Sequence, residues 1–257
     1  MIDIKTKEEI EIMREGGKIL AGIMEELRSK VKPGINTLYL ERLAQTLIEK
    51  AGGQCSFKGY KSKNGETIRT YPFCICTSIN EQIVHTPPSE RILKEGDVLK
   101  IDIGMLYKGF HTDMAITVSV GKVSFEAQRL IRITKKALKL ALSKIRPGNT
   151  TGDIGNTIQR FVESQGFNVA RELCGHGIGR ELHEEPQILN YGKRRTGEKL
   201  REGMVICVEP MVMIGDWHLK RTEDGFGYQT VDGSLTAHFE HTIAVTKTGY
   251  EILTSLK

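Results

Sequence analysis

Four acidic residues stand in apolar, strand-like segments of the sequence. They are Asp102 in Lys-Ile-Asp-Ile, Asp113 in Thr-Asp-Met, Glu209 in Val-Glu-Pro and Glu240 in Phe-Glu-His. Carboxylates in such surroundings are costly to desolvate, and four that converge would repel one another. Divalent cations would offset both costs, so these residues predict a metal site. A surface position or an ordinary salt bridge is the alternative for any one of them taken alone.

A histidine among glycines is the fifth candidate ligand. His176 lies in the segment Cys-Gly-His-Gly-Ile-Gly, where the glycines allow a close backbone approach and leave the imidazole unobstructed. A glycine-rich loop with an incidental histidine is the alternative. His183 follows seven residues later, and His85 stands in the first half of the chain. Either could bind metal, but beside five other ligands both better fit hydrogen bonds to a substrate.

Two pairs of helices are expected. Apolar residues from Leu40 to Ile48 recur at the helical spacing, with a polar cap at 36–37 and glycines at 52–53 to end the helix. The pattern returns 114 residues later, before Gly166. Another helix precedes each copy. The first is opened by a capping box at Thr6, and the second is capped by Ser124.

The strands repeat as well, and the repeat aligns the four acidic candidate ligands and the two further histidines in pairs. An offset of 107 aligns Asp102 with Glu209, one of 127 aligns Asp113 with Glu240, and one of 98 aligns His85 with His183. Asp102 and Asp113 are eleven residues apart, with turn residues at 104–109 between them. This spacing predicts two adjacent antiparallel strands joined by a short loop.

The repeat predicts an α/β (α+β) fold built from duplicated α-α-β units. Two halves, about 1–120 and 121–257, would be related by a pseudo-twofold within one catalytic domain spanning 1–257. Helices would cover one face of a central antiparallel sheet, and equivalent strands would meet at the axis. The four carboxylates would converge there.

Composition limits the class of protein. The chain has 257 residues, of which 39% are hydrophobic and 27% charged, as in ordinary globular proteins. The net charge of +5 is weak support for a polyanionic partner such as a ribosome, against the alternative of an ordinary solvated surface. Residues 1–14 lack the apolar core of a signal peptide, and no apolar run predicts a membrane span. Five cysteines without a CxxC pair predict reduced thiols, no disulfide and a cytoplasmic protein.

Together these residues resemble a known family. Asp102, Asp113, His176, Glu209 and Glu240, in this order, are similar to the five metal ligands of the methionine aminopeptidases, which have the pita-bread fold. The segments 175–179, 183–186 and 240–242 carry the resemblance most sharply, and it covers nearly the whole chain. The spacings of 33 and 31 residues from the histidine to the two glutamates leave no room for the helical insertion of type II enzymes, so type I is implied.

The resemblance implies two divalent cations, of Co, Mn, Fe or Zn. Asp102 would bind one cation, His176 and Glu209 the other, and Asp113 and Glu240 would bridge them. A bridging hydroxide would attack the first peptide bond. The resemblance also makes three residues catalytic: Glu209 would transfer the proton, His183 would stabilise the oxyanion, and His85 would hold the leaving amide.

The substrate pocket departs from the family pattern. Tyr71 and Cys76 match pocket positions beside the two histidines, but Leu182 and Phe226 stand where bacterial relatives usually carry Phe and Trp. Thr-Pro-Pro at 86–88 replaces Gly-Ile-Pro, and the segment 54–70 contains extra residues. These departures bear on side-chain selectivity and not on the metal centre.

The sequence therefore predicts a cytoplasmic, monomeric exopeptidase. It would remove the initiator methionine from nascent polypeptides, prefer a small second residue, contact the ribosome transiently and bind no membrane. One alternative is an Xaa-Pro aminopeptidase or dipeptidase, although those normally carry a further amino-terminal domain, and here the catalytic unit begins near Thr6. The other alternative is a non-catalytic relative that binds RNA or ribosomes, which would be expected to have lost ligands.

Overall fold

The computed structural model describes residues 2–64 and 67–256. Within them lie four helices: α1 (Lys7–Lys30), α2 (Thr37–Lys50), α3 (Phe125–Leu142) and α4 (Thr151–Ser164). The first turns of α1, α2 and α3 are capped as the sequence predicts, because Thr6, Asn36 and Ser124 accept hydrogen bonds from backbone N–H groups. The capping box at Thr6 is confirmed, and Thr150 with Asp153 forms a second one. None of the described helices is long and apolar enough to cross a membrane.

The strands form one large sheet and three small ones. The large sheet contains β1 (Gln54–Cys55), β4 (Ile75–Ile79), β6 (Val98–Tyr107), β7 (Phe110–Ser119), β9 (Cys174–Gly177), β10 (Glu184–Leu189), β11 (Val205–Val208), β16 (Glu240–Val245) and β17 (Tyr250–Ile252). The small sheets contain β8 (Asn168–Val169) with β12 (Met211–Met213) and β15 (Thr236–His238), β5 (Gln82–Val84) with β13 (Leu219–Arg221) and β14 (Tyr228–Thr230), and β2 (Lys61–Asn64) with β3 (Thr67–Thr70). Every pairing is antiparallel.

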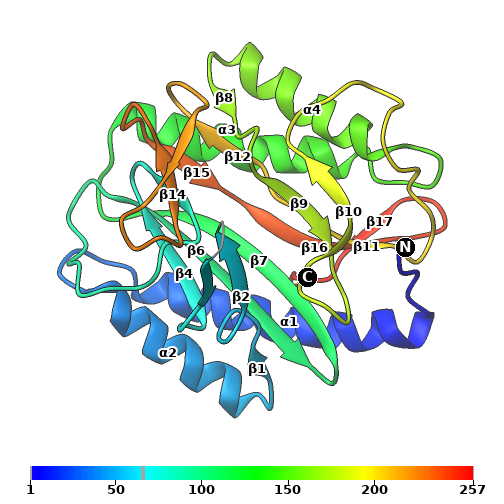
Figure 1. The fold of residues 1–257 in the computed structure, drawn as a ribbon, viewed down its shortest axis with the longest axis horizontal. Helices are drawn as coiled ribbons and strands as arrows, with labels where there is room; N and C mark the ends of the chain where they lie inside the picture. The colour runs from blue at the N-terminus through cyan, green and yellow to red at the C-terminus, as the bar shows by residue number, and fades with distance from the viewer. Residues whose placement is uncertain (1, 65–66, 257) are drawn as a thin grey trace.

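The large sheet joins the two halves of the chain at its centre. Its order is β1-β6-β7-β16-β11-β9-β10, with β7 of the first half paired to β16 of the second. Helices α1 and α2 share an apolar core with β4, β6 and β7, whereas α3 and α4 share another with β11, β12 and β16. In Figure 1 the two helix pairs accordingly lie along opposite halves of the curled sheet.

Alternation along β6 separates a core face from a polar face. Leu99, Ile101 and Ile103 pack into the core with α1 and α2, and Asp102 between them faces the other side. The predicted antiparallel pairing with β7 is confirmed, although β6 continues to Tyr107. Only Lys108 and Gly109 form the turn, both with positive φ, which suits a two-residue hairpin turn.

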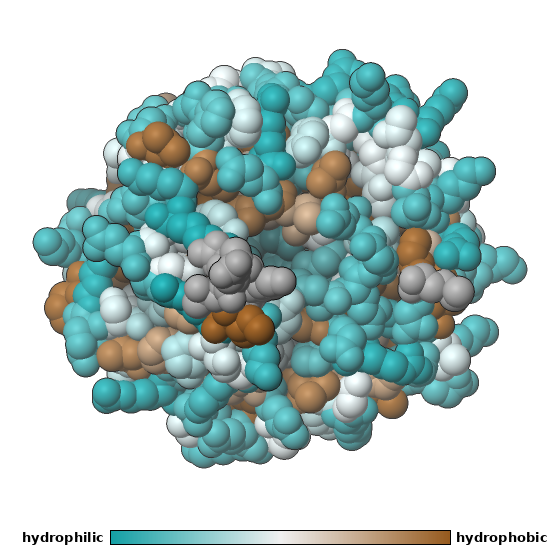
Figure 2. Space-filling view, viewed as in Figure 1, coloured by the Kyte–Doolittle hydropathy of each residue, from teal (hydrophilic) through white to brown (hydrophobic). Residues whose placement is uncertain are grey.

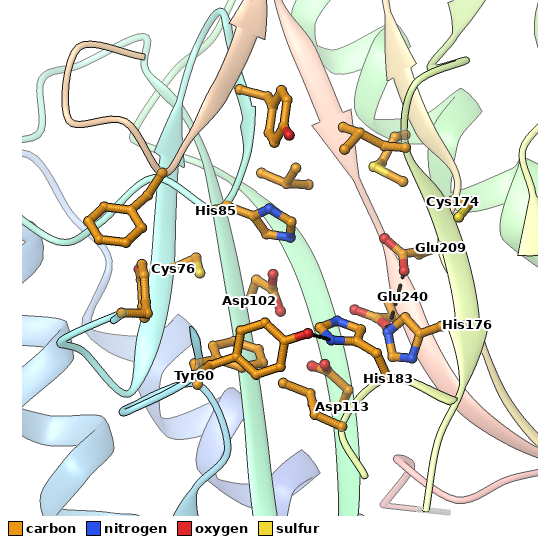
Figure 3. A pocket seen from close by; sticks show the side chains of 18 of the residues that line it. Tyr60, Cys76, His85, Asp102, Asp113, Cys174, His176, His183, Glu209 and Glu240 are labelled. Carbon is orange, nitrogen blue, oxygen red and sulfur yellow. Dashed lines mark hydrogen bonds and ion pairs between the residues drawn. The ribbon is translucent and has the colours of Figure 1, made fainter. Parts of the chain in front are cut away.

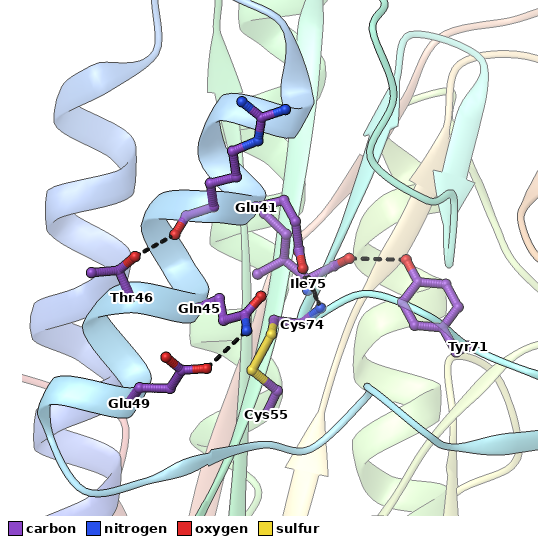
Figure 4. The surroundings of a disulfide bond; sticks show 9 residues. Glu41, Gln45, Thr46, Glu49, Cys55, Tyr71, Cys74 and Ile75 are labelled. Atoms are coloured by element: carbon purple, nitrogen blue, oxygen red, sulfur yellow. Dashed lines mark hydrogen bonds between the residues drawn. A yellow bond between two sulfur atoms is a disulfide. The ribbon is translucent and has the colours of Figure 1, made fainter.

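The prediction that no disulfide forms is wrong. Cys55 and Cys74 are bonded, and their Cα atoms are 4.9 Å apart. They meet because β1 and β4 pair end to end along the same edge of β6, where Cys55 lies opposite Met105 and the residue after Cys74 lies opposite Ile103. Sequence spacing could not show this shared edge. Figure 4 shows the bond beside α2, where the Glu41 carboxylate accepts the Cys74 N–H.

Candidate metal centre and substrate cavity

Five neighbouring strands of the large sheet each contribute one candidate ligand. Asp102 lies on β6, Asp113 on β7, Glu240 at the start of β16, Glu209 directly after β11, and His176 on β9. Because these strands are consecutive in the sheet, their register places the five side chains around one cavity (Figure 3). The predicted convergence of the carboxylates is therefore observed.

The distances between these side chains suit cation binding. His176 Nε2 lies 3.7 Å from Glu209 Oε1 and 4.0 Å from Glu240 Oε1. Ligand atoms of Asp102, Asp113 and Glu240 all lie within 4.8 Å of one another. The Thr242 hydroxyl fixes β7 against β16, because it donates to the Asp113 carbonyl at 2.7 Å and accepts the Asp113 N–H at 2.9 Å.

The electrostatics of the carboxylates call for positive charge. Burial raises the pKa of Asp102 to about 6. Burial and the neighbouring acids raise the pKa of Asp113 and Glu240 well above their usual range, and burial with Asp102 does the same for Glu209. Such shifts arise when like charges share a desolvated site. Within the described residues, Asp102 Oδ1, Asp113 Oδ1 and Glu240 Oε1 are buried without a hydrogen-bond partner, so the residues fit divalent cations.

His176 has the protonation state of a metal ligand. Its Nδ1–H donates to the Gly177 carbonyl at 2.9 Å, which leaves the Nε2 lone pair facing the glutamates. Burial lowers the pKa of His176 to about 3, so the imidazole is neutral. The flanking glycines are needed for close packing, since a Cβ on Gly175 would collide with the Cys207 carbonyl and one on Gly177 with the Glu185 carbonyl.

The cavity has a volume of about 270 Å³ and contains every site residue predicted from the sequence. The space-filling view shows the surface hollowed near the middle of this face (Figure 2). Beside the carboxylates, the lining includes Tyr71, Cys76, Leu182, Phe226, His85 and His183. The Tyr71 hydroxyl donates to the Ile75 carbonyl at 2.9 Å, and its ring meets Phe226 edge to face, with centroids 5.3 Å apart. The part of the cavity around Tyr71 and Phe226 is apolar.

Among the residues that were missed in the sequence, two polar side chains lie beside predicted site residues. The Tyr60 hydroxyl lies 2.8 Å from His183 Nδ1, and it comes from the segment 54–70 with the extra residues (Figure 3). His238 is buried, with Nε2 3.3 Å from Glu209 Oε2, and burial lowers its pKa to about 4. The offset of 127 that aligns the second aspartate with Glu240 also aligns His111 with His238, and this was the available signal.

Two helix pairs on a curled antiparallel sheet, with acidic side chains carried into one cavity by its central strands, form the architecture of the pita-bread metallopeptidases. The chain belongs to metallopeptidase family M24, whose model matches residues 11–247. The fold class expected from the sequence is thereby confirmed. Family membership implies the use of divalent metal ions and of peptide substrates.

Several relatives that match over their full length are named methionine aminopeptidases. The chain is 44% identical over 254 residues to methionine aminopeptidase 1 of Bacillus subtilis, covering 99% of both chains. It is 42% identical over 258 residues to the methionine aminopeptidase of Escherichia coli, covering 100% of this chain and 95% of that one. The crystal structure of methionine aminopeptidase from Thermotoga maritima superposes with a TM-score of 0.94, at 44% identity, over 99% of this chain and 100% of the other.

More distant structures share the fold alone. Prolidase from Pyrococcus furiosus superposes with a TM-score of 0.77 at 22% identity. The match covers 99% of this chain and 66% of the prolidase.

Proposed function

We propose that this metallopeptidase is a methionine aminopeptidase that removes the initiator methionine from nascent polypeptides. The observation that carries the proposal is a cavity in which apolar side chains adjoin a cluster of buried acids. The full-length relatives with this name support the same activity.

The proposal includes two divalent cations. Asp102, Asp113, His176, Glu209 and Glu240 would hold them, with Asp102 at one cation, His176 and Glu209 at the other, and Asp113 and Glu240 shared between the two. Such a pair supplies hydroxide near neutral pH by lowering the pKa of a bound water. A ligand set that mixes carboxylates with imidazole suits Mn, Fe, Co and Zn.

The remaining steps belong to side chains of the cavity. The Glu209 carboxylate accepts the proton of the attacking water and returns it to the leaving amine. His183 donates a hydrogen bond to the substrate carbonyl oxygen as negative charge develops there. Its ring orientation is held by Tyr60, whose hydroxyl lies 2.8 Å from Nδ1.

His85 holds the amide of the scissile bond. It lines the cavity and has a φ of 61°, a left-handed conformation that residues with a Cβ seldom adopt. Strain of this kind is concentrated at functional sites, and it supports a role in contact with the substrate.

The first residue of the substrate lies against Tyr71, Cys76, Leu182 and Phe226. Methionine is flexible, and its thioether makes favourable contacts with aromatic rings. The resemblance places Phe and Trp where Leu182 and Phe226 stand, and these smaller side chains should leave a wider pocket than in those relatives. We therefore expect more tolerance for leucine or norleucine. The second residue must be small, because the chain beyond it has to leave through the cleft.

Initial rates across an Xaa-Ala-Ser tripeptide series test this proposal. Methionine is expected to give the highest kcat/KM, with leucine and norleucine lower by roughly 10- to 200-fold, the range for small changes in an apolar pocket. A preference for proline at the second position, with indifference to the first residue, would establish an Xaa-Pro peptidase instead. Protein that bound no metal and cleaved nothing would support the RNA- or ribosome-binding alternative.

We further propose that the enzyme acts as a monomer in the cytoplasm and contacts the ribosome transiently. The support is the substrate itself, since an initiator methionine becomes available as the polypeptide leaves the ribosome. Co-sedimentation with ribosomes at low and at moderate salt tests the contact, and it should weaken as salt rises.

A further inference from the structure

His238 is a buried histidine with no role in the function proposed above. Its side chain is 1% exposed, and it ends β15 two residues before Glu240. The backbone is fixed on both sides of the strand. Its N–H donates to Thr117 Oγ1 at 2.9 Å, its carbonyl accepts from the same hydroxyl at 2.7 Å, and β12 pairs with it at Met211. The position of the imidazole is therefore set by the fold.

The His238 ring faces the candidate ligands. Nε2 lies 3.3 Å from Glu209 Oε2 and 4.0 Å from Glu240 Oε2. Neither ring nitrogen has a hydrogen-bond partner in the described part of the chain. A buried polar group without a partner is uncommon and calls for an explanation such as an ion.

The two glutamates lie between two histidines. Their Oε1 atoms are nearest His176, and their Oε2 atoms are nearest His238. Two ligand atoms that each bind one cation at roughly 2.1 Å and at a tetrahedral angle are about 3.4 Å apart. The separation of 3.3 Å between His238 and Glu209 matches this spacing, and ligand atoms of Glu209, His238 and Glu240 all lie within 4.8 Å of one another.

We propose that His238 is a sixth protein ligand of the metal centre, binding a cation through Nε2 on the Oε2 side of Glu209 and Glu240. The inference rests on the dinuclear centre of the proposed function. A second imidazole adds a neutral nitrogen donor to a ligand set made mostly of carboxylates. It therefore favours Co, Fe or Zn at this position over Mn, which prefers oxygen.

The chain contains a matched control. His111 stands two residues before Asp113, as His238 stands two residues before Glu240. Its Nδ1 lies 2.8 Å from Ser56 Oγ, and its backbone N–H donates to the Gly179 carbonyl. Within the described residues it belongs to none of the clusters that could hold a metal.

Cobalt titration of metal-free protein against a chromophoric chelator tests the proposal. The proteins are the wild type, His238→Ala, His238→Gln and His111→Gln. Glutamine keeps an N–H that can donate to Glu209, but its amide binds these cations poorly. Both His238 variants should bind one cobalt at least about 10-fold more weakly and change the visible cobalt spectrum. His111→Gln should bind cobalt as the wild type does.

Other results would overturn the proposal in distinct ways. If His238→Gln binds as the wild type while His238→Ala binds weakly, His238 only donates a hydrogen bond to Glu209. Unchanged binding in both variants would leave it no part in the centre. A wild type that binds no cobalt would refute the dinuclear centre itself.

Circular dichroism of the metal-free proteins shows whether the variants fold. If they do not, a measurement on the wild type still tests the proposal. In cobalt-loaded protein, paramagnetically shifted NMR signals should arise from two imidazoles, His176 and His238. Signals from a single imidazole would overturn the proposal.

Discussion

The two halves of the molecule bring their carboxylates to the cavity in different ways. In the first half, β6 and β7 are strands of ten residues joined by a two-residue turn, so one register fixes Asp102 and Asp113 as diagonal neighbours. In the second half, β11 and β16 are separated by a long segment that contains β12 to β15. Their acids are fixed by the pairing of Val208 with His241, next to Glu209 and Glu240.

The difference shows which connections can supply further side chains to the cavity. A two-residue turn has no room for further groups, whereas the segment between β11 and β16 brings Phe226, Tyr228 and Met211 to the cavity and His238 to the acids. The first half supplies its remaining lining residues from two regions. The segment before β4 carries Tyr60 and Tyr71, and the β4–β5 hairpin with the residue after it carries Cys76, Val84 and His85. In both halves the strands position the acids, and connecting segments shape the surroundings.

Removing the Asp113 carboxylate from the β6–β7 hairpin should have the largest effect on metal binding and activity. Asp113 is buried among the other three acids, so Asp113→Asn removes a charge and a ligand where the proposed cations meet. We expect metal to be lost and kcat/KM to fall by about 10⁴-fold or more, as when one member of a catalytic unit is removed. Elemental analysis with an activity assay measures both. Asp216→Asn, at an exposed position outside the cavity, is the control, and equal losses in the two variants would contradict the assignment.

Metal removal tests the candidate ligands of both halves at once. Chelator-treated enzyme should be inactive and should recover with added Mn, Co or Fe, because five candidate ligands exceed the needs of one tetrahedral ion. Full activity after verified removal of metal would refute the metal-dependent mechanism.

His183→Ala should lower kcat by about 10²- to 10³-fold, the usual cost of losing one donor to the oxyanion. His183 lies against His176, with ring centroids 4.4 Å apart, yet its Nδ1 contacts Tyr60. Metal content should therefore stay unchanged, as measured by elemental analysis. Loss of one metal equivalent would make His183 a ligand.

The sequence predicted two kinds of feature: those that depend on residues close together in the chain, and those that occur in both copies of the repeat. Helix caps such as Thr6 depend on residues three positions apart, and the strand acids stood out because each has a counterpart in the repeat. The contacts it missed depend on tertiary structure. The cysteines meet only because two strands share an edge of β6, and Tyr60 reaches His183 across 123 residues. His238 repeats His111 in sequence, but the two rings have different surroundings, which the alignment could not show.

The disulfide should matter for stability and little for catalysis. Cys55 and Cys74 are 19 residues apart and enclose the segment that carries Tyr60 and Tyr71. Replacing both with serine should lower the free energy of unfolding by about 2–4 kcal/mol, because a bond closing a loop of this size restricts the unfolded chain. Denaturant midpoints with and without reductant measure this. If reductant left the wild-type midpoint unchanged, the bond would not form in solution.

Tyr60→Phe should have the smallest effect and is the finest test of how connecting segments tune the site. The variant keeps the ring but removes the hydroxyl beside His183 Nδ1, a contact of 2.8 Å. We expect kcat to fall about 2- to 10-fold with metal content unchanged, the equivalent of one ordinary hydrogen bond. Tyr39→Phe, on the exposed side of α2, is the control.

A double-mutant cycle separates positioning from direct participation by Tyr60. If Tyr60 acts only by orienting His183, the Tyr60→Phe change should have no further effect on kcat in the His183→Ala background. Independent losses in the double variant would show that the Tyr60 hydroxyl contacts the substrate itself. A change confined to KM would instead place Tyr60 in substrate binding, and the segment 54–70 would then belong to the pocket and not to the support of His183.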